Sequence, residues 1–173
     1  AAKSAEKDAS AAQVEGTRLG IEEQRRQFNL VRQLAAPFVT AGTKGLNGSL
    51  SLIGLNGKAA QAKEIQGIES GAEFNSLVRN GENAILSNAS ATGGLRGGNT
   101  EAALAQFRPE ILSSLINKQI GSYGGLATNG QNAALGVGTA AQSMANNVSG
   151  LHGDAAAAQA GNALARGQAN SNA

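Results

Sequence analysis

Large apolar side chains are scarce in this sequence of 173 residues. Aromatic residues make up 3% of it, tryptophan is absent, and much of the 41% counted as hydrophobic is alanine, which buries little area. Apolar burial contributes roughly 25 cal/mol per Å², so a single copy gains little to offset the conformational entropy lost on folding. The composition predicts a chain that buries itself against a partner or stays partly loose, with a second copy as the simplest partner.

Residues 1–36 place apolar side chains at a seven-residue spacing, with a partial second seam. The positions are Val14, Ile21, Phe28 and Val31. The spacing predicts one long N-terminal helix. Pro37 should end it, because the residue before a proline disfavours helical backbone. We interpret the apolar face as an oligomer seam, and an exposed amphipathic helix in a small bundle is the alternative.

Residues 37–57 are rich in glycine and asparagine and are predicted to form a loop or hairpin. The dipeptide Asn-Gly occurs at residues 47–48 and again at 56–57, and it is a strong signal for a hairpin turn. We therefore expect a short β-hairpin or an extended loop near 45–57. Since a lone hairpin is barely stable in water, it should lean on neighbours, for example by lining or closing a channel. An ordinary surface loop is equally compatible.

Residues 58–121 read as a helical hairpin interrupted by a glycine hinge at 91–99. The hinge glycines are Gly93, Gly94, Gly97 and Gly98. Asn99 or Thr100 can cap the following helix. Pro109 favours a kink or a fresh start within that helix. Arg96 is interpreted as a contact to a neighbouring subunit or to solvent.

Residues 122–173 form an Ala/Gly-rich C-terminal region whose only charged residues are Asp154 and Arg166. Small and apolar residues alternate there at spacings of three and four, as in a coiled-coil seam. The seam residues are Ala134, Val137, Ala141, Met144, Val148 and Leu151. Close packing of helices in an assembly is one interpretation, and a partly disordered tail is the other. The fold class predicted for the whole chain is mainly α, with elongated helices, helical hairpins and Gly-rich hinges, in a ring or tube-like oligomer.

Catalytic, cofactor and metal sites are not predicted. The glycine stretch at 91–99 lacks the Gly-Lys-Ser/Thr ending of a phosphate-binding loop. Cysteine is absent, and the single histidine, His152, cannot build a usual zinc site. The net charge of +2 does not imply general adhesion to nucleic acid. No stretch is long and apolar enough for a spanning helix.

Residues 85–138 read "ILSNASATGGLRGGNTEAALAQFRPEILSSLINKQIGSYGGLATNGQNAALGVG". This block resembles the DNA transfer proteins of phages, which are the internal virion, ejection or pilot proteins of short-tailed and related tailed phages. The pattern that carries the resemblance is NASATGG, then RGGNT, then FRP followed by spaced leucines. It implies a virion protein stored near the portal and tail that leaves before or with the genome.

The resemblance implies a non-enzymatic role in a conduit for genome ejection across the host cell envelope. Implied partners are further copies, other ejection, portal or tail proteins, the host outer membrane or periplasm, and DNA in transient non-specific contact. A static adaptor of the tail or portal that is never ejected is the first alternative. A peptidoglycan hydrolase is a more distant alternative. A DNA-binding protein is a further one, and its affinity for DNA would fall steeply as the salt concentration rises.

Overall fold

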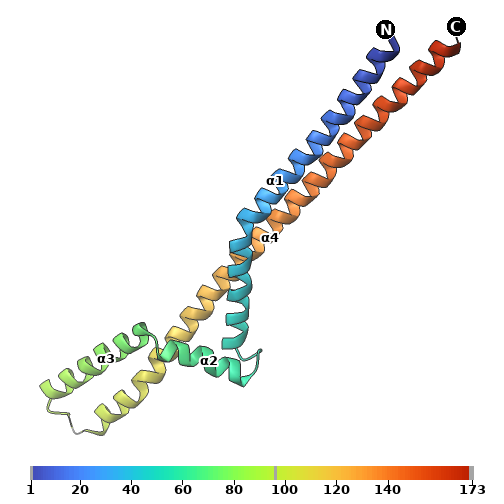
Figure 1. Cartoon of the computed structure of the whole chain (residues 1–173). Coiled ribbons are helices and arrows are strands. Elements are labelled where there is room, and N and C mark those ends of the chain that lie inside the picture. Colours follow the sequence, from blue (N-terminus) through green and yellow to red (C-terminus); the bar gives the residue numbers. More distant parts are fainter. Residues whose placement is uncertain (1, 96, 172–173) are drawn as a thin grey trace. The chain divides into compact units, whose positions relative to one another are not determined.

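The computed structural model of this chain describes residues 2–95 and 97–171, which form four helices and include no strand (Figure 1). The helices are α1 (Ala2–Leu52), α2 (Lys58–Glu69), α3 (Ala72–Ala91) and α4 (Gly98–Ser171). The prediction of a mainly α fold is therefore confirmed. The chain divides into unit 1, made of Ala1–Pro37 and Asn132–Ala173, and unit 2, made of Phe38–Gln131. Each unit is described by itself.

Unit 1 is an antiparallel pair of helices formed by the first part of α1 and the last part of α4 (Figure 1). A Cβ built on Gly20 would lie 3.1 Å from Leu151 Cδ1, so the two helices are in contact there. One turn further along α1, Asn147 Nδ2 donates a hydrogen bond of 3.2 Å to Gln24 Oε1. No side chain that the structure describes in unit 1 is buried.

Unit 2 contains the hydrophobic core of the described residues. Phe74 and Val78 of α3 pack with Leu115 of α4, and the partly buried Ile68, Ile111 and Leu112 surround them. The two helices run antiparallel, and two ion pairs span them beside the core. Arg108 Nε lies 2.7 Å from Glu82 Oε1, and Lys118 Nζ lies 2.5 Å from Glu73 Oε1.

A close crossing of α1 and α4 forms the other side of unit 2. Gly42 of α1 faces Gly130 of α4, and a Cβ built on either glycine would lie 2.5 Å from the Cα of the other. One turn further along α1, a Cβ on Gly45 would lie 2.7 Å from the Tyr123 carbonyl oxygen. A Cβ on Gly48 would clash with the ring of Tyr123. Glycines at every third position thus form the surface on which α4 rests.

The β-hairpin expected near 45–57 is wrong, because α1 continues to Leu52. The Asn-Gly at 47–48 lies inside the helix, where Gly48 makes room for a ring rather than a turn. Only residues 53–57 form a connection, and there the second Asn-Gly does lie in a turn. Gly57 has φ 94°, and Asn56 Nδ2 donates 3.2 Å to the carbonyl oxygen of Asn47.

The predicted helix end before Pro37 is also wrong, since α1 passes through this residue. Likewise α4 passes through Pro109 without the fresh start expected there. A proline inside a helix removes one hydrogen bond and costs about 3 kcal/mol. On either side of Pro37, α1 is in contact with α4, at Gly20 within unit 1 and at Gly42 within unit 2. The region 122–173 belongs to the same helix as the residues before it, up to Ser171.

Candidate assembly surfaces and the glycine loop

The glycine stretch between α3 and α4 is a compact turn that ends α3. Gly93 has φ 76°, its N–H donates 3.4 Å to the Ser90 carbonyl, and the Gly94 N–H donates 2.8 Å to the Ala89 carbonyl. These two bonds define a Schellman motif with the left-handed residue at Gly93. Thr100 Oγ1 donates 2.9 Å to the Gly94 carbonyl and so ties the start of α4 to the turn.

Of the four predicted hinge glycines, Gly93 is the one whose backbone requires glycine. Gly94 and Gly98 have no positive φ, and a Cβ on Gly98 would meet nothing within 4 Å. The turn joins α3 to α4 as predicted, while its bending as a hinge stays a prediction. Arg96 lies outside the described residues.

Replacing Gly93 by alanine is expected to lower the free energy of unfolding of unit 2 by about 1–2 kcal/mol, because a side chain disfavours left-handed backbone. Gly98→Ala is the matched control and should change it by less than about 0.5 kcal/mol. Urea unfolding can be followed by the fluorescence of Tyr123, since the chain has one tyrosine and no tryptophan. Equal effects of the two substitutions would contradict the Schellman assignment.

The residues predicted to form an oligomer seam lie on α1 and α4 of unit 1. Those half-buried in unit 1 are Ile21, Phe28, Val137, Ala141, Met144, Val148 and Leu151. Those exposed are Val14, Val31 and Ala134. A shallow pocket of about 180 Å³ opens along this contact, lined by Phe28, Val31, Met144 and neighbouring polar residues. The half-buried residues therefore pack α1 against α4 within one chain. Their contact with a second copy stays a prediction.

A larger open pocket of about 380 Å³ lies in unit 2 beside the core. Glu64, Glu73 and Lys118 line it together with Tyr123 and apolar residues. Four of its polar side chains already bind one another in pairs, because Tyr123 Oη donates 3.1 Å to Glu64 Oε2 and Lys118 pairs with Glu73. The described residues include no group of three or more metal-ligating side chains and no helix long and apolar enough to cross a membrane.

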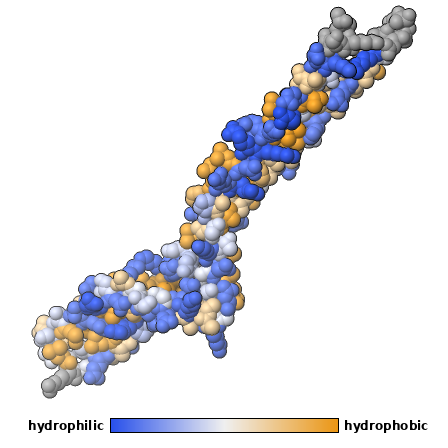
Figure 2. Space-filling model, in the orientation of Figure 1, coloured by the Kyte–Doolittle hydropathy of each residue, from blue (hydrophilic) through white to orange (hydrophobic). Residues whose placement is uncertain are grey.

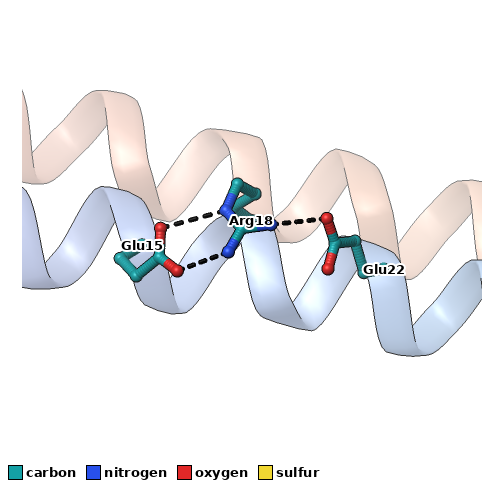
Figure 3. Close-up of polar contacts among 3 residues, drawn as sticks. All are labelled: Glu15, Arg18 and Glu22. Carbon is teal, nitrogen blue, oxygen red and sulfur yellow. Dashed lines mark hydrogen bonds and ion pairs between the residues drawn. The ribbon is translucent and has the colours of Figure 1, made fainter.

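Ion pairs line the exposed side of α1 in unit 1. Arg18 lies between Glu15 and Glu22 and pairs with both (Figure 3). About two turns beyond Arg18, Arg26 pairs with Glu23 at 2.7 Å. The hydrogen bonds that Arg26 and Gln27 donate lower the pKa of Glu23 to about 2. Pairs at i, i+3 and i, i+4 stabilise a helix that has little buried surface.

Sequence reasoning missed three leucines on the same helix. Leu19, Leu30 and Leu34 are 52%, 50% and 65% exposed, and they lie on the side of α1 away from Ile21 and Phe28. Figure 2 shows hydrophobic and hydrophilic residues interspersed along the surface of unit 1. The signal that could have found them is a second set of apolar residues on the side of the helix away from the seam, with charged residues between the leucines.

Acid is expected to weaken unit 2 through the pair of Glu82 and Arg108. The hydrogen bond from Arg108 lowers the pKa of Glu82. Since the folded pKa lies below the unfolded value of about 4.3, the stabilisation is present above that value and is lost as the pH falls through the folded pKa. The urea midpoint should therefore decrease from pH 6 to pH 3, and less so in Glu82→Gln. Glu69→Gln, on the exposed side of α2, is the control, and its urea midpoint should decrease between pH 6 and pH 3 as much as that of the parent chain.

Comparisons with known proteins identify the chain's relatives. It is 34% identical to protein p32 of Acyrthosiphon pisum secondary endosymbiont phage 1 over 148 residues, which are 86% of this chain and 69% of that protein. It is 30% identical to DNA transfer protein gp7 of Salmonella phage ST64T over 135 residues, which are 78% and 58% of the two chains. It is 29% identical to internal virion protein gp7 of Salmonella phage P22 over 149 residues, which are 86% and 64%. No solved structure shows a significant match to the chain.

These matches, to which the long helices conform, place the chain in the class of phage DNA ejection proteins. A family model described as bacteriophage P22 DNA ejection protein gp7 matches residues 1–172, and the chain belongs to this family. The resemblance found in residues 85–138 is thereby confirmed. The chain spans between 58% and 69% of the length of the three relatives described.

Proposed function

We propose that this chain is an internal virion protein that associates with further copies of itself and with other ejection, portal or tail proteins. It leaves the virion with the genome and helps form a conduit for phage DNA across the host cell envelope. The family's description as DNA ejection proteins and the relatives' names, DNA transfer protein and internal virion protein, support the role in DNA delivery. The structural observation that carries self-association is the lack of any buried side chain among the described residues of unit 1.

Unit 1 presents apolar surface that a second helix would cover. A pair of helices without a buried core gains little from the hydrophobic effect. The exposed leucines of α1, together with Leu135 and Leu164 of α4, are large side chains that gain from burial between copies. Contacts of this kind build tubes or rings when the arrangement closes on itself.

Transient contact with DNA suits the composition of α4. Between Lys118 and Asp154 the helix contains no Lys, Arg, Asp or Glu. Contacts with phosphate supply most of the affinity of proteins for DNA, and they need positive charge. A conduit wall made of such a segment would let DNA pass without holding it.

The experiment that tests the proposal follows the protein during infection. Phage particles carrying an epitope-tagged copy are adsorbed to host cells, and the empty particles, the outer membrane and the periplasmic fraction are then separated. We expect the tagged chain in the envelope fractions, while a capsid protein stays with the particles as the control. If the chain stays wholly with the empty particles, it is a static adaptor and the conduit proposal is wrong.

A further inference from the structure

The exposed side of α1 in unit 1 carries a pattern that is complementary to its own reverse, with leucine opposite leucine and acid opposite base. Leu19 and Leu30 are separated by about three helical turns and therefore lie on one side of the helix. Glu23 and Arg26 lie between them as an exposed ion pair. The midpoint of the leucines and the midpoint of the ion pair coincide, between Gln24 and Arg25. Reversal about this point exchanges Leu19 with Leu30 and Glu23 with Arg26.

We propose that two copies of this chain pair antiparallel through the outer α1 face, defined as Leu19, Glu23, Arg26 and Leu30. A twofold axis passes between Gln24 and Arg25. Each Leu19 packs against Leu30 of the second copy, and each Glu23 pairs with Arg26 of the second copy. This contact is isologous, because the same surface serves both copies. It rests on the self-association in the proposed function and names one surface for it. An isologous contact by itself closes a dimer, so a ring or tube needs a second contact in addition.

Charge complementarity selects the second copy as the occupant and sets its direction. In a parallel arrangement in register, Glu23 would face Glu23 and Arg26 would face Arg26, and like charges in such positions are destabilising. In the antiparallel arrangement both pairs are opposite in sign. The contact does not compete with α4, because α4 packs against the side of α1 that holds Gly20, Gln24 and Phe28.

The neighbouring ion-pair network does not share this symmetry. Arg18 already binds both Glu15 and Glu22 within one chain (Figure 3). Reversal about the same midpoint would place Glu15 opposite Leu34 and Arg18 opposite Val31. These positions offer no opposite charge, so the network supports its own helix and supplies a control for the test.

Cysteine pairing tests the arrangement directly, since the natural chain has no cysteine. Leu19→Cys and Leu30→Cys chains are purified separately, then mixed and oxidised mildly. We expect a disulfide-linked dimer in the mixture and none in either chain alone. In the antiparallel pair two copies of position 19 are about 16 Å apart along the axis, beyond the Cα separation of about 7 Å that a disulfide spans. A dimer of Leu19→Cys alone, or no dimer in the mixture, overturns the proposal.

Charge reversal tests the ion pairs without a new bond. Glu23→Arg alone and Arg26→Glu alone should each associate about tenfold more weakly in sedimentation, because two favourable pairs become two repulsive ones. Mixing the two variants should restore association, since each then faces the opposite charge. Loss of the pair within one helix cannot be rescued in this way. Glu15→Arg, which breaks only the Arg18 network, should associate like the parent, and circular dichroism checks that all variants remain helical.

Failure of this inference and failure of the proposed function give different results. If the parent chain forms oligomers but the mixed cysteine variants do not cross-link and mixed charge variants show no rescue, another surface mediates assembly and this inference falls alone. If the parent chain stays a monomer at every concentration, including in the presence of its virion partners, the self-association in the proposed function falls as well.

Discussion

Replacing Phe74 by alanine is expected to lower the free energy of unfolding of unit 2 by about 3–5 kcal/mol. Phe74 is 7% exposed and packs with Val78 and Leu115, and few other described side chains are as well buried. Truncation removes the ring's own burial and leaves a cavity that its neighbours fill only in part. With so small a core, no other cluster in the described residues can compensate.

The measurement is urea unfolding at fixed protein concentration, followed by Tyr123 fluorescence and by circular dichroism. Leu77→Ala on the same helix is the matched control, because Leu77 is 40% exposed. It should lower the free energy of unfolding by less than about 1 kcal/mol. Similar losses for both variants would mean that the packing of α3 against α4 does not hold unit 2 together.

Replacing Gly42 by alanine is expected to lower the free energy of unfolding of unit 2 by roughly 1–3 kcal/mol, as overpacking does. The added methyl group would meet the backbone of Gly130 at 2.5 Å, so the helices must move apart along the whole crossing. Backbone atoms cannot rotate away as a flexible side chain can. Gly130→Ala should have a similar effect.

Two further variants sharpen this test. The double variant with alanine at both positions should lose less than the sum of the single losses, because helices already moved apart leave room for the second methyl. Gly125→Ala, also in α4, meets nothing within 4 Å and should raise stability by about 0.5–1 kcal/mol, as alanine does in an exposed helix. A loss at Gly125 equal to that at Gly42 would show that the close crossing is not the cause.

The helical fold followed from the sequence wherever a long spacing of apolar residues marked one face. Val137, Met144, Val148 and Leu151 were predicted as a seam from their spacing alone, and the structure places them half-buried in unit 1. The sequence could not say whether the partner of this face is the same chain or another. That choice depends on contacts between residues far apart in the chain, such as Gln24 with Asn147.

Local turn signals misled the reading of residues 45–57. Asn-Gly favours a turn, yet Gly48 lies inside α1, where the ring of Tyr123 needs its missing side chain. The signal that separates the two cases is the spacing of Gly42, Gly45 and Gly48, which places all three on nearly one side of a helix. The same distinction explains the loop after α3, where Gly93 does take the left-handed conformation of a helix end.

Hydrogen exchange measured at two protein concentrations tests the central claim, that unit 1 becomes ordered by association whereas unit 2 is held by its own core. Amides of residues 7–37 and 132–168 should exchange more slowly when the concentration is raised from the nanomolar to the micromolar range, because association protects them. Amides around Phe74 and Leu115 should be protected equally at both protein concentrations. If unit 1 is fully protected in a chain that sedimentation shows to be monomeric, the account is contradicted.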